Sequence, residues 1–277
     1  MASKLAVDRA DMPGESMAEM NCIGSQDQMT VTIGGIPVRR YSAAQWCELM
    51  LEDVRLRRAG LVDRAKVVTT ANGQVVSLFA SDPAFQTAML ASDYVAADGM
   101  SIVNASRKFT HFPLPERVAT TDWFHDAARV AQLQGLRFYI LGGLDEVNRK
   151  AIARMREMYP HLQIVGSRDG YFTRAQTDEI VADINRTKAD ILWLGIGNPR
   201  QLVLAQQIKH KLETVAWIRT CGGLYDHVAG IHRRAPKAFQ KLGMEWAWRV
   251  MLEPRRLFWR YLTTNVHAMW RMRFHSR

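Results

Sequence analysis

Short apolar runs alternate with amphipathic segments along the chain, and most runs end in glycine or another turn residue. Runs of this length predict buried strands, whereas apolar residues spaced three and four apart predict helices that cover them. The alternation predicts an α/β fold with a mostly parallel sheet and helices on both faces. In the second half the expected strands are 136–143, 162–166, 189–197 and 216–223, and the expected helices are 145–158, 176–186 and 199–212.

The first half predicts a hairpin ahead of the sheet. Residues 29–42 alternate with a period of two around Gly34 and Gly35, which suit a tight turn. Residues 1–28 are polar, rich in methionine and without periodicity, so we expect a disordered leader there. Further expected elements are helices at 43–57 and 74–90 and short buried strands at 66–70 and 94–97.

The C-terminal segment concentrates positive charge. Between His232 and Arg277 eleven lysines and arginines face two acids, a local balance of +9 in a chain whose net charge is +10. Pro254 suits the first turn of a helix, and a helical projection of 255–273 separates two faces. The basic face holds Arg256, Arg260, His267 and Arg271, and the apolar face holds Phe258, Leu262, Val266 and Met269. Either this helix packs its apolar face on the domain, or it contacts a membrane surface or another anionic ligand.

Length and composition fit one large α/β domain or one domain with appendages, since 277 residues with 48% hydrophobic content allow a full core. We expect a core at 29–230 and a basic, membrane-associating appendage at 231–277. Three scattered cysteines indicate reduced thiols in a cytoplasmic protein. We expect neither a signal peptide nor a spanning helix, because the N-terminal segment is acidic and no apolar run is long enough. A pI near 9.8 also suits nucleic acid, so a non-enzymatic protein that binds nucleic acid or lipid is kept as an alternative.

Two glycine turns suit a phosphate group. Gly142-Gly143 and Gly195-x-Gly197 each end a buried strand and precede a helix, and Asn198 is the expected N-cap of the second helix. Free amides at a helix start bind anions, although glycines at such turns often serve only the turn. Neither turn completes the G-x-G-x-x-G pattern of a nicotinamide site, so a nicotinamide-dependent oxidoreductase is kept only as an alternative class.

Asp98 is a candidate base. It follows the short strand at 94–97 and precedes a glycine, where a carboxylate can be partly desolvated and can accept a proton. The alternative is a carboxylate that caps a turn or helix through nearby amides. Thr70 ends the preceding strand and Asn72 lies in the turn after it, and these two residues either hydrogen-bond a sugar or cap the next helix.

These turns occur in an order that resembles a known family. The motifs are Thr70-x-Asn72, Ala97-Asp98-Gly99, Glu116-Arg117-Val118 with Asp122, LGG at 141–143, Tyr159-Pro160, Gly170-Tyr171-Phe172, Gly195-x-Gly197-x-Pro199-x-Gln201, Gly222-Gly223, Arg234-Ala235-Pro236, Glu245-Trp246 and Glu253-Pro254. From about Met29 to Tyr261 the chain resembles the WecG/TagA/CpsF glycosyltransferase family, glycosyltransferase family 26.

The resemblance implies a Rossmann-like core and an inverting hexosyltransferase. Such an enzyme moves a sugar from a UDP-sugar to a polyprenyl-diphosphate-linked acceptor in bacterial exopolysaccharide or surface polysaccharide biosynthesis. It implies a peripheral protein at the cytoplasmic face of the inner membrane, on an anionic surface, with no metal or other cofactor. We expect no nucleic acid as partner, and a homo-oligomer stays open.

The donor sugar is open within the family. Its members use UDP-glucose, UDP-N-acetylmannosamine or the uronic acid of the latter. The content of arginine, tryptophan and alanine suits a proteobacterial exopolysaccharide enzyme, which favours UDP-glucose and β-1,4-glucosyl transfer.

The family's site residues can be carried over by position. Asp98 matches the proposed catalytic base, and Arg249 and Arg256 match arginines thought to face the diphosphate. The expected substrate-binding residues are Thr70, Asn72, Arg117, Gly142, Gly143, Gly195, Gly197, Gln201 and Arg260.

The chain departs from the family pattern at three places. Leu202 stands where the family has glutamate, and Ala119-Thr120 stand where it has threonine and glycine. Trp259 replaces a third appendage arginine, with Arg260 next to it. We expect these changes to bear on which sugar is transferred.

Overall fold

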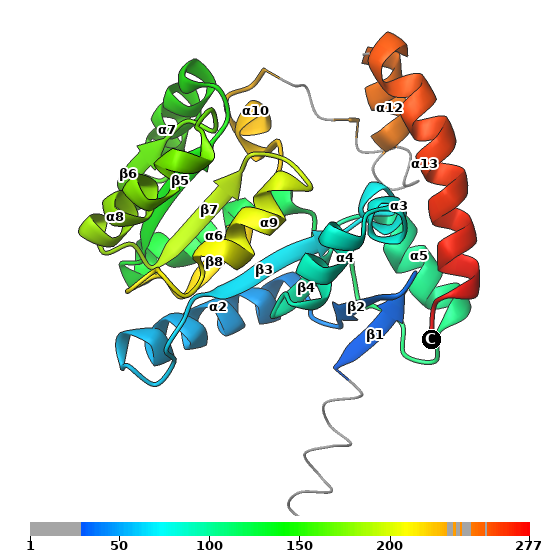
Figure 1. The fold of residues 1–277 in the computed structure, drawn as a ribbon, viewed down its shortest axis with the longest axis horizontal. Helices are drawn as coiled ribbons and strands as arrows, with labels where there is room; N and C mark the ends of the chain where they lie inside the picture. Colours follow the sequence, from blue (N-terminus) through cyan, green and yellow to red (C-terminus); the bar gives the residue numbers. More distant parts are fainter. Residues whose placement is uncertain (1–28, 232–234, 237–238, 240–244, 253) are drawn as a thin grey trace, which may run out of the picture.

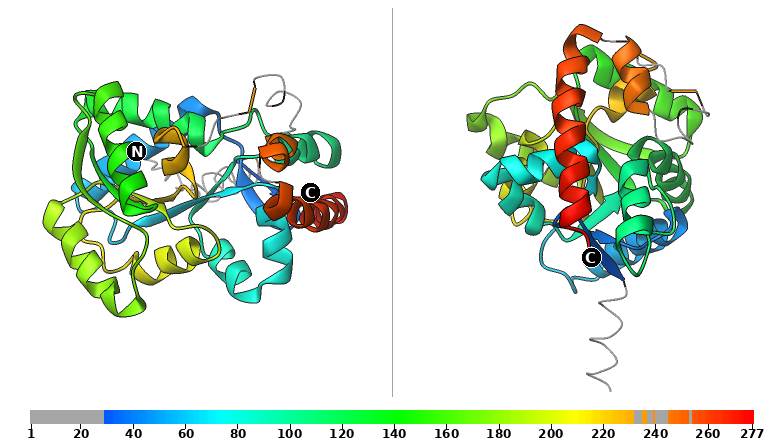
Figure 2. Two further views of the ribbon diagram at one scale, coloured as in Figure 1. Left: turned by 90° about the horizontal axis from the view of Figure 1, so that it is seen from above. Right: turned by 90° about the vertical axis from the view of Figure 1, so that its right-hand side faces the viewer.

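The computed structural model describes residues 29–231, 235–236, 239, 245–252 and 254–277. Within them a six-stranded sheet forms the centre of the protein, and helices cover both of its faces (Figures 1 and 2). Neighbouring strands are parallel throughout, so the predicted α/β fold with a parallel sheet is confirmed. The expected disordered leader, 1–28, lies outside the described residues.

The strands of the sheet are short, and they are buried except at the edge strand that covers 163–168. They are β3 Lys66–Ala71, β4 Tyr94–Ala97, β5 Arg137–Gly142, β6 Gln163–Arg168, β7 Ile191–Gly195 and β8 Trp217–Thr220. Their order is β4-β3-β8-β7-β5-β6, so the last strand in the sequence lies near the middle of the sheet. Because the strands are parallel, all their carboxyl ends lie at one edge.

The helices enclose a separate apolar cluster on each face of the sheet. They are α2 Ala43–Arg58, α3 Gly73–Ser81, α4 Pro83–Leu90, α5 Met100–Phe109, α6 Thr120–Gln134, α7 Asp145–Met158, η1 Arg174–Gln176, α8 Thr177–Thr187, α9 Arg200–Ile208, α10 Leu224–Val228, α12 Glu245–Leu252 and α13 Pro254–Phe274. Helices α2, α6, α7 and α10 cover one face. Helices α3, α4, α5, α8, α9 and α13 cover the other face.

Several predicted boundaries were wrong. The single helix expected at 74–90 is two helices, because the Asp82 side chain accepts a hydrogen bond from the backbone N–H of Phe85 and Pro83 begins a new helix. The helix expected to reach residue 212 ends at Ile208. Helices α5, α6, α10 and α12 were not anticipated.

The predicted hairpin is confirmed. Strands β1 Thr30–Ile33 and β2 Ile36–Arg39 are antiparallel, and Gly34 and Gly35 turn between them with φ of 60° and 91°. Positive φ at both turn positions is the geometry that glycine adopts without strain. The end of α13 joins this hairpin, because Thr32 and Arg277 exchange two backbone hydrogen bonds of 3.0 Å.

Helix α13 lies along α3 and α5 (Figure 2, right). Ala268 and Met272 are buried in the core cluster on that face of the sheet. Val266 and Met269 are each 66% exposed, so packing of the expected apolar face on the domain is wrong for these two residues. Ala268 lies against Gly73 at the start of α3, so Ala268 and Met272 form the buried side of α13 and Val266 and Met269 face outward. No described helix is long and apolar enough to cross a membrane.

Buried carboxylates at the amino ends of the strands pair with arginines. Asp190 accepts hydrogen bonds from Arg58 at 2.7 Å and from Arg137 at 3.1 Å, and Asp93 pairs with Arg64 at 2.7 Å. Burial disfavours the charged form of both carboxyls. The arginine hydrogen bonds outweigh this, and the pKa of Asp93 and of Asp190 lies below its ordinary value.

Candidate active site

Asp98 lies at the carboxyl edge of the sheet, directly after β4, and it is partly buried. Its Oδ1 accepts a hydrogen bond from the backbone N–H of Thr120 at 3.3 Å, and its Oδ2 accepts one from the Thr120 hydroxyl at 3.2 Å. Thr120 is the first residue of α6, whose N-cap Ala119 supplies no side-chain acceptor. The capping alternative for Asp98 is therefore confirmed, and its role as a base stays a prediction.

Burial and two arginines set the charge state of Asp98. Burial raises the pKa of this carboxyl, and the charges of Arg219 and Arg117 together with the Thr120 hydrogen bonds offset part of the rise. Arg219 lies in β8 with 1% of its surface exposed, and burial lowers its pKa to about 10. A carboxylate with a raised pKa holds a proton more readily than a surface aspartate, which suits a general base.

The ends of β3 and β4 place Thr70 and Asn72 beside Asp98. Ala71 pairs with Ala97 in the ladder, and the backbone N–H of Asp98 donates to the Ala71 carbonyl at 2.9 Å. The turns after these two strands therefore lie next to each other at the same edge.

Asn72 has a structural task in the folded chain. Its side chain is the N-cap of α3 and accepts a hydrogen bond from the backbone N–H of Val75 at 3.0 Å. Thr70 is 9% exposed near the end of β3. The capping alternative is thus confirmed for Asn72, while contact of either residue with a sugar stays a prediction.

The four predicted phosphate-binding glycines have different surroundings. A Cβ on Gly142, whose φ is 139°, would lie 2.1 Å from the carbonyl oxygen of Gly195, so these two strand ends touch through their backbones. The backbone N–H of Gly143 also donates to that carbonyl, at 3.2 Å. Gly197 has open space around the position of a Cβ, and so does Gly222 in the next turn along the sheet edge. A ligand phosphate therefore has more room at Gly197 than at Gly142, and binding at all four positions stays a prediction.

Gln201 links two turns of the carboxyl edge. The residue is 4% exposed, its Nε2 donates to Asn198 Oδ1 at 3.0 Å, and its Oε1 accepts from the backbone N–H of Gly222 at 3.1 Å. Asn198 was expected to be the N-cap of α9, but that helix begins at Arg200 with Pro199 at the cap position. The side chain of Asn198 orients Gln201 instead of capping the helix.

Of the four predicted site arginines, the structure describes the side chain of Arg117 and not those of the other three. Arg117 is 10% exposed and lies 3.5 Å from Asp122 in an ion pair. Arg249 lies in α12, and Arg256 and Arg260 lie in α13, but their side chains are outside the described part of the structure. Their roles stay predictions.

Helix α13 contacts the first turns of α3, which follow the Asn72 turn. A Cβ on Gly73 would meet Asn265 and Ala268 at 4.0 Å, and the Ser77 hydroxyl lies 3.0 Å from Nδ1 of His267. The C-terminal helix and one turn of the candidate site are therefore in direct contact.

Sequence reasoning missed Arg219 and Thr120. The available signal was an arginine inside the apolar strand 216–223, where a charge is costly unless it is paired. That signal marks Arg219 as unusual, but only the fold shows that its hydrogen-bond partner is Thr120.

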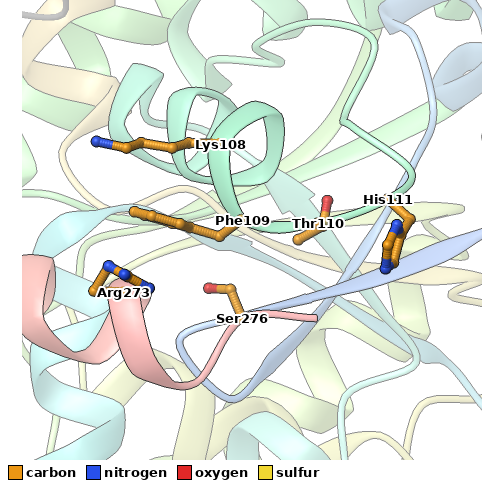
Figure 3. Close-up of a pocket in the computed structure, with 6 residues that line it drawn as sticks. All are labelled: Lys108, Phe109, Thr110, His111, Arg273 and Ser276. Carbon is orange, nitrogen blue, oxygen red and sulfur yellow. The ribbon is translucent and has the colours of Figure 1, made fainter.

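A cavity of about 390 Å³ lies at the far end of α5 from Asp98 (Figure 3). Its lining residues are Lys108, Phe109, Thr110, His111, Arg273 and Ser276. The Phe109 ring lies between the cations of Lys108 and Arg273, which are 5.5 Å and 5.3 Å from its centroid. This basic cavity belongs to the surface beside the end of α13, and the candidate active site is elsewhere. The described residues contain no group of three or more His, Cys, Asp or Glu side chains placed to bind a metal ion.

The fold and the turns at its carboxyl edge define a Rossmann-like α/β protein, a class whose ligands bind where the parallel strands end. Residues 31–277 match the family described as "Glycosyl transferase WecG/TagA/CpsF family". The chain therefore belongs to this family of glycosyltransferases, as its motifs predicted, and its substrates are a sugar donor and an acceptor.

Proposed function

We propose that the protein is an inverting enzyme that transfers a sugar from a UDP-sugar to a polyprenyl-diphosphate-linked acceptor. The product enters bacterial exopolysaccharide or another surface polysaccharide. The observation that carries this proposal is the partly buried carboxylate of Asp98 at the carboxyl edge of a glycosyltransferase sheet. It lies next to the Thr70 and Asn72 turn, which we propose contacts the sugar.

In the proposed reaction Asp98 accepts the proton of the acceptor hydroxyl. The hydroxyl oxygen forms a bond to the anomeric carbon, and the bond from that carbon to the diphosphate oxygen breaks with inversion. UDP leaves with the electron pair. General base catalysis of this kind contributes about 10² to 10⁴ in rate.

The leaving diphosphate needs positive charge. We propose that Arg249, Arg256 and Arg260 supply it, because guanidinium groups match phosphate oxygens. Their helices, α12 and α13, stand beyond the end of the sheet toward which the strands point (Figure 1). The open backbone at Gly197 is the place we propose for the approach of the phosphates.

We propose glucose as the transferred sugar, in β-1,4 linkage. N-acetylmannosamine and its uronic acid are the other donors to test, since the family includes both. The departures at Ala119 and Thr120 support a donor preference of this chain's own, because Thr120 contacts Asp98, whereas Leu202 is buried in the apolar core.

We propose peripheral binding to an anionic membrane surface at the cytoplasmic face of the inner membrane. Along α13 the exposed apolar side chains are Val266, Met269, Trp270 and Phe274, with exposures between 54% and 66%. Their spacing of three and four places them on one stripe, and the basic cavity of Figure 3 lies beside the end of that stripe. Apolar and cationic groups together are the composition of an interfacial helix.

The test is incubation of the full chain with separate UDP-sugars and a polyprenyl-diphosphate-linked sugar, followed by the mass of the lipid product. We expect a mass increase of one hexose with UDP-glucose, and we expect Asp98→Asn to abolish most of it. A gain of N-acetylmannosamine or its uronic acid instead would change the donor and keep the reaction. No product with any UDP-sugar, combined with binding of NAD or of nucleic acid, would refute the proposal.

A further inference from the structure

Arg219 reaches the candidate base through one hydroxyl group. Its Nη2 donates to the Oγ1 of Thr120 at 3.4 Å, and that hydroxyl donates to Oδ2 of Asp98 at 3.2 Å. The three residues come from β8, α6 and the end of β4, so the contact joins three separate elements of the sheet edge.

The direction of these hydrogen bonds follows from the chemistry of the groups. A guanidinium only donates, and a hydroxyl has one proton, so the proton of Thr120 has to go to Asp98. The backbone N–H of Thr120 holds the other oxygen of Asp98 at 3.3 Å. An ionised carboxylate accepts about four hydrogen bonds, so two sites remain for a substrate proton.

Arg219 is buried without an acid in direct contact. It is 1% exposed, and its Nε and Nη1 find no hydrogen-bond partner among the described residues. Its guanidinium carbon lies 5.3 Å from the centroid of the Trp123 ring, a distance at which the cation is attracted to the ring face. A buried cation with two unpaired nitrogens costs stability, so its position next to Asp98 needs a reason beyond packing.

We propose that Arg219 is a positioning residue for sugar transfer: acting through the Thr120 hydroxyl, it orients the Asp98 carboxylate and supplies its countercharge. The inference rests on the proposed role of Asp98 as base.

The charges that act on Asp98 among the described residues come from two directions. Arg219 faces it from β8, and Arg117 faces it from the segment before α6, where Arg117 also pairs with Asp122. Thr120 contributes its two hydrogen bonds from α6. Loss of the Arg219 charge leaves burial less opposed, so the carboxylate will lose its ionised form at a higher pH than in the wild type.

The test is the pH dependence of kcat/KM on its acid side, with saturating acceptor. For Arg219→Met we expect the acid limb to move up by about one pH unit or more, the shift that a nearby opposite charge produces. Thr120→Val should move the acid limb in the same direction by a smaller amount. The conservative variants Arg219→Lys and Thr120→Ser should keep most of the wild-type profile. If Arg219→Met does not fold, the inference is tested by comparing the acid limb of Thr120→Val with that of Thr120→Ser.

Arg137→Met is the matched control, because Arg137 also pairs with a buried carboxylate, Asp190, but at the amino edge of the sheet. It should lower the Tm and leave the acid limb in place. An unshifted acid limb in Arg219→Met and Thr120→Val overturns the inference. Full turnover of Asp98→Asn would instead refute the proposed function, because Asp98 would then not be the base. The role of Arg219 would fall with it.

Discussion

At the scale of single residues, Asp98 combines two tasks. It caps α6 through the backbone N–H of Thr120, and it is the proposed proton acceptor. The cap holds the carboxylate in a fixed orientation, and burial keeps it more basic than a surface aspartate. A substitution at this position therefore has to be judged by turnover and by stability together.

Asp98→Asn should lower turnover by about 10² to 10⁴, because an amide cannot take up the proton of the acceptor. Asparagine keeps one oxygen that can accept from the backbone N–H of Thr120, so the cap of α6 and the fold should be retained. Initial rates on a lipid-linked acceptor measure the loss of turnover, and thermal unfolding measures the change in stability. Asp126→Asn, an exposed acid on the same helix α6, is the control and should change neither.

Gly142→Ala should destabilise the fold by more than about 3 kcal/mol, beyond ordinary overpacking. The new methyl group would sit 2.1 Å from the backbone oxygen of Gly195, and backbone at a strand end cannot move aside. Gly60→Ala is the control for a glycine with positive φ in open space, because its φ is 72° and no atom lies within 4 Å of the new methyl group. Urea unfolding of both variants measures the difference, and equal costs would contradict the close contact.

The roles of some of these residues could be predicted from the sequence, and those of others could not. Asp98 could be found because an acid beside glycine after a short apolar strand is a local pattern. Arg219 could not be assigned a role, because its partner Thr120 is remote in sequence and its counterpart Asp98 lies on another strand. The side-chain roles of Asn72 and Gln201 were likewise hidden, since they depend on which turns the sheet places next to each other.

At the scale of elements, strands were easier to predict than helix boundaries. Buried parallel strands are nearly continuous apolar runs, which the sequence shows directly. The break between α3 and α4 depends on Asp82 and Pro83, two residues inside an otherwise helical pattern. The orientation of α13 was also beyond sequence reasoning, because Ala268 and Met272 became the buried stripe through their fit against α3.

The outward stripe of α13 predicts how membrane binding will respond to charge. Met269→Glu together with Trp270→Glu should weaken binding to vesicles rich in anionic lipid by about tenfold or more, because the change removes apolar contact and adds repulsion. Co-sedimentation measures it. Leu61→Glu changes a residue that is 70% exposed in another part of the protein and should bind like the wild type. Equal binding of all variants would exclude this stripe as the contact.

At the scale of the whole molecule, the two edges of the sheet have different electrostatics. At the amino edge Asp93 and Asp190 are held in their charged form by arginines. At the carboxyl edge burial outweighs the charges of two arginines, and the pKa of Asp98 stays raised. The sheet therefore has a stabilising edge and an edge whose charges are available for chemistry.

The amino edge predicts acid lability. The pKa of Asp190 is lowered in the folded chain, so the folded state binds fewer protons than the unfolded chain, and the stabilisation is lost as pH falls through the folded pKa. Asp190→Asn should cost about 3 kcal/mol at neutral pH, near the low end for a broken buried pair because both arginines are partly exposed. Its stability should then depend less on pH below about 4, the ordinary pKa of an aspartate, where the wild type loses this contribution.

Urea unfolding across this pH range compares the variant with the wild type. Asp145→Asn is the control, since its ion pair with Arg149 is exposed and contributes little. A variant whose stability falls as steeply with acid as that of the wild type would show that Asp190 is not the responsible group.

The late position of β8 in the chain has a consequence for biosynthesis. During translation the β3–β4 pair and the β5–β6–β7 group are made first, and each keeps an open inner edge until β8 joins them. Open edges of apolar strands invite association with other chains. A ribosome that stops before residue 217 will therefore release an aggregation-prone fragment, because that fragment lacks the strand that joins the two groups into one sheet.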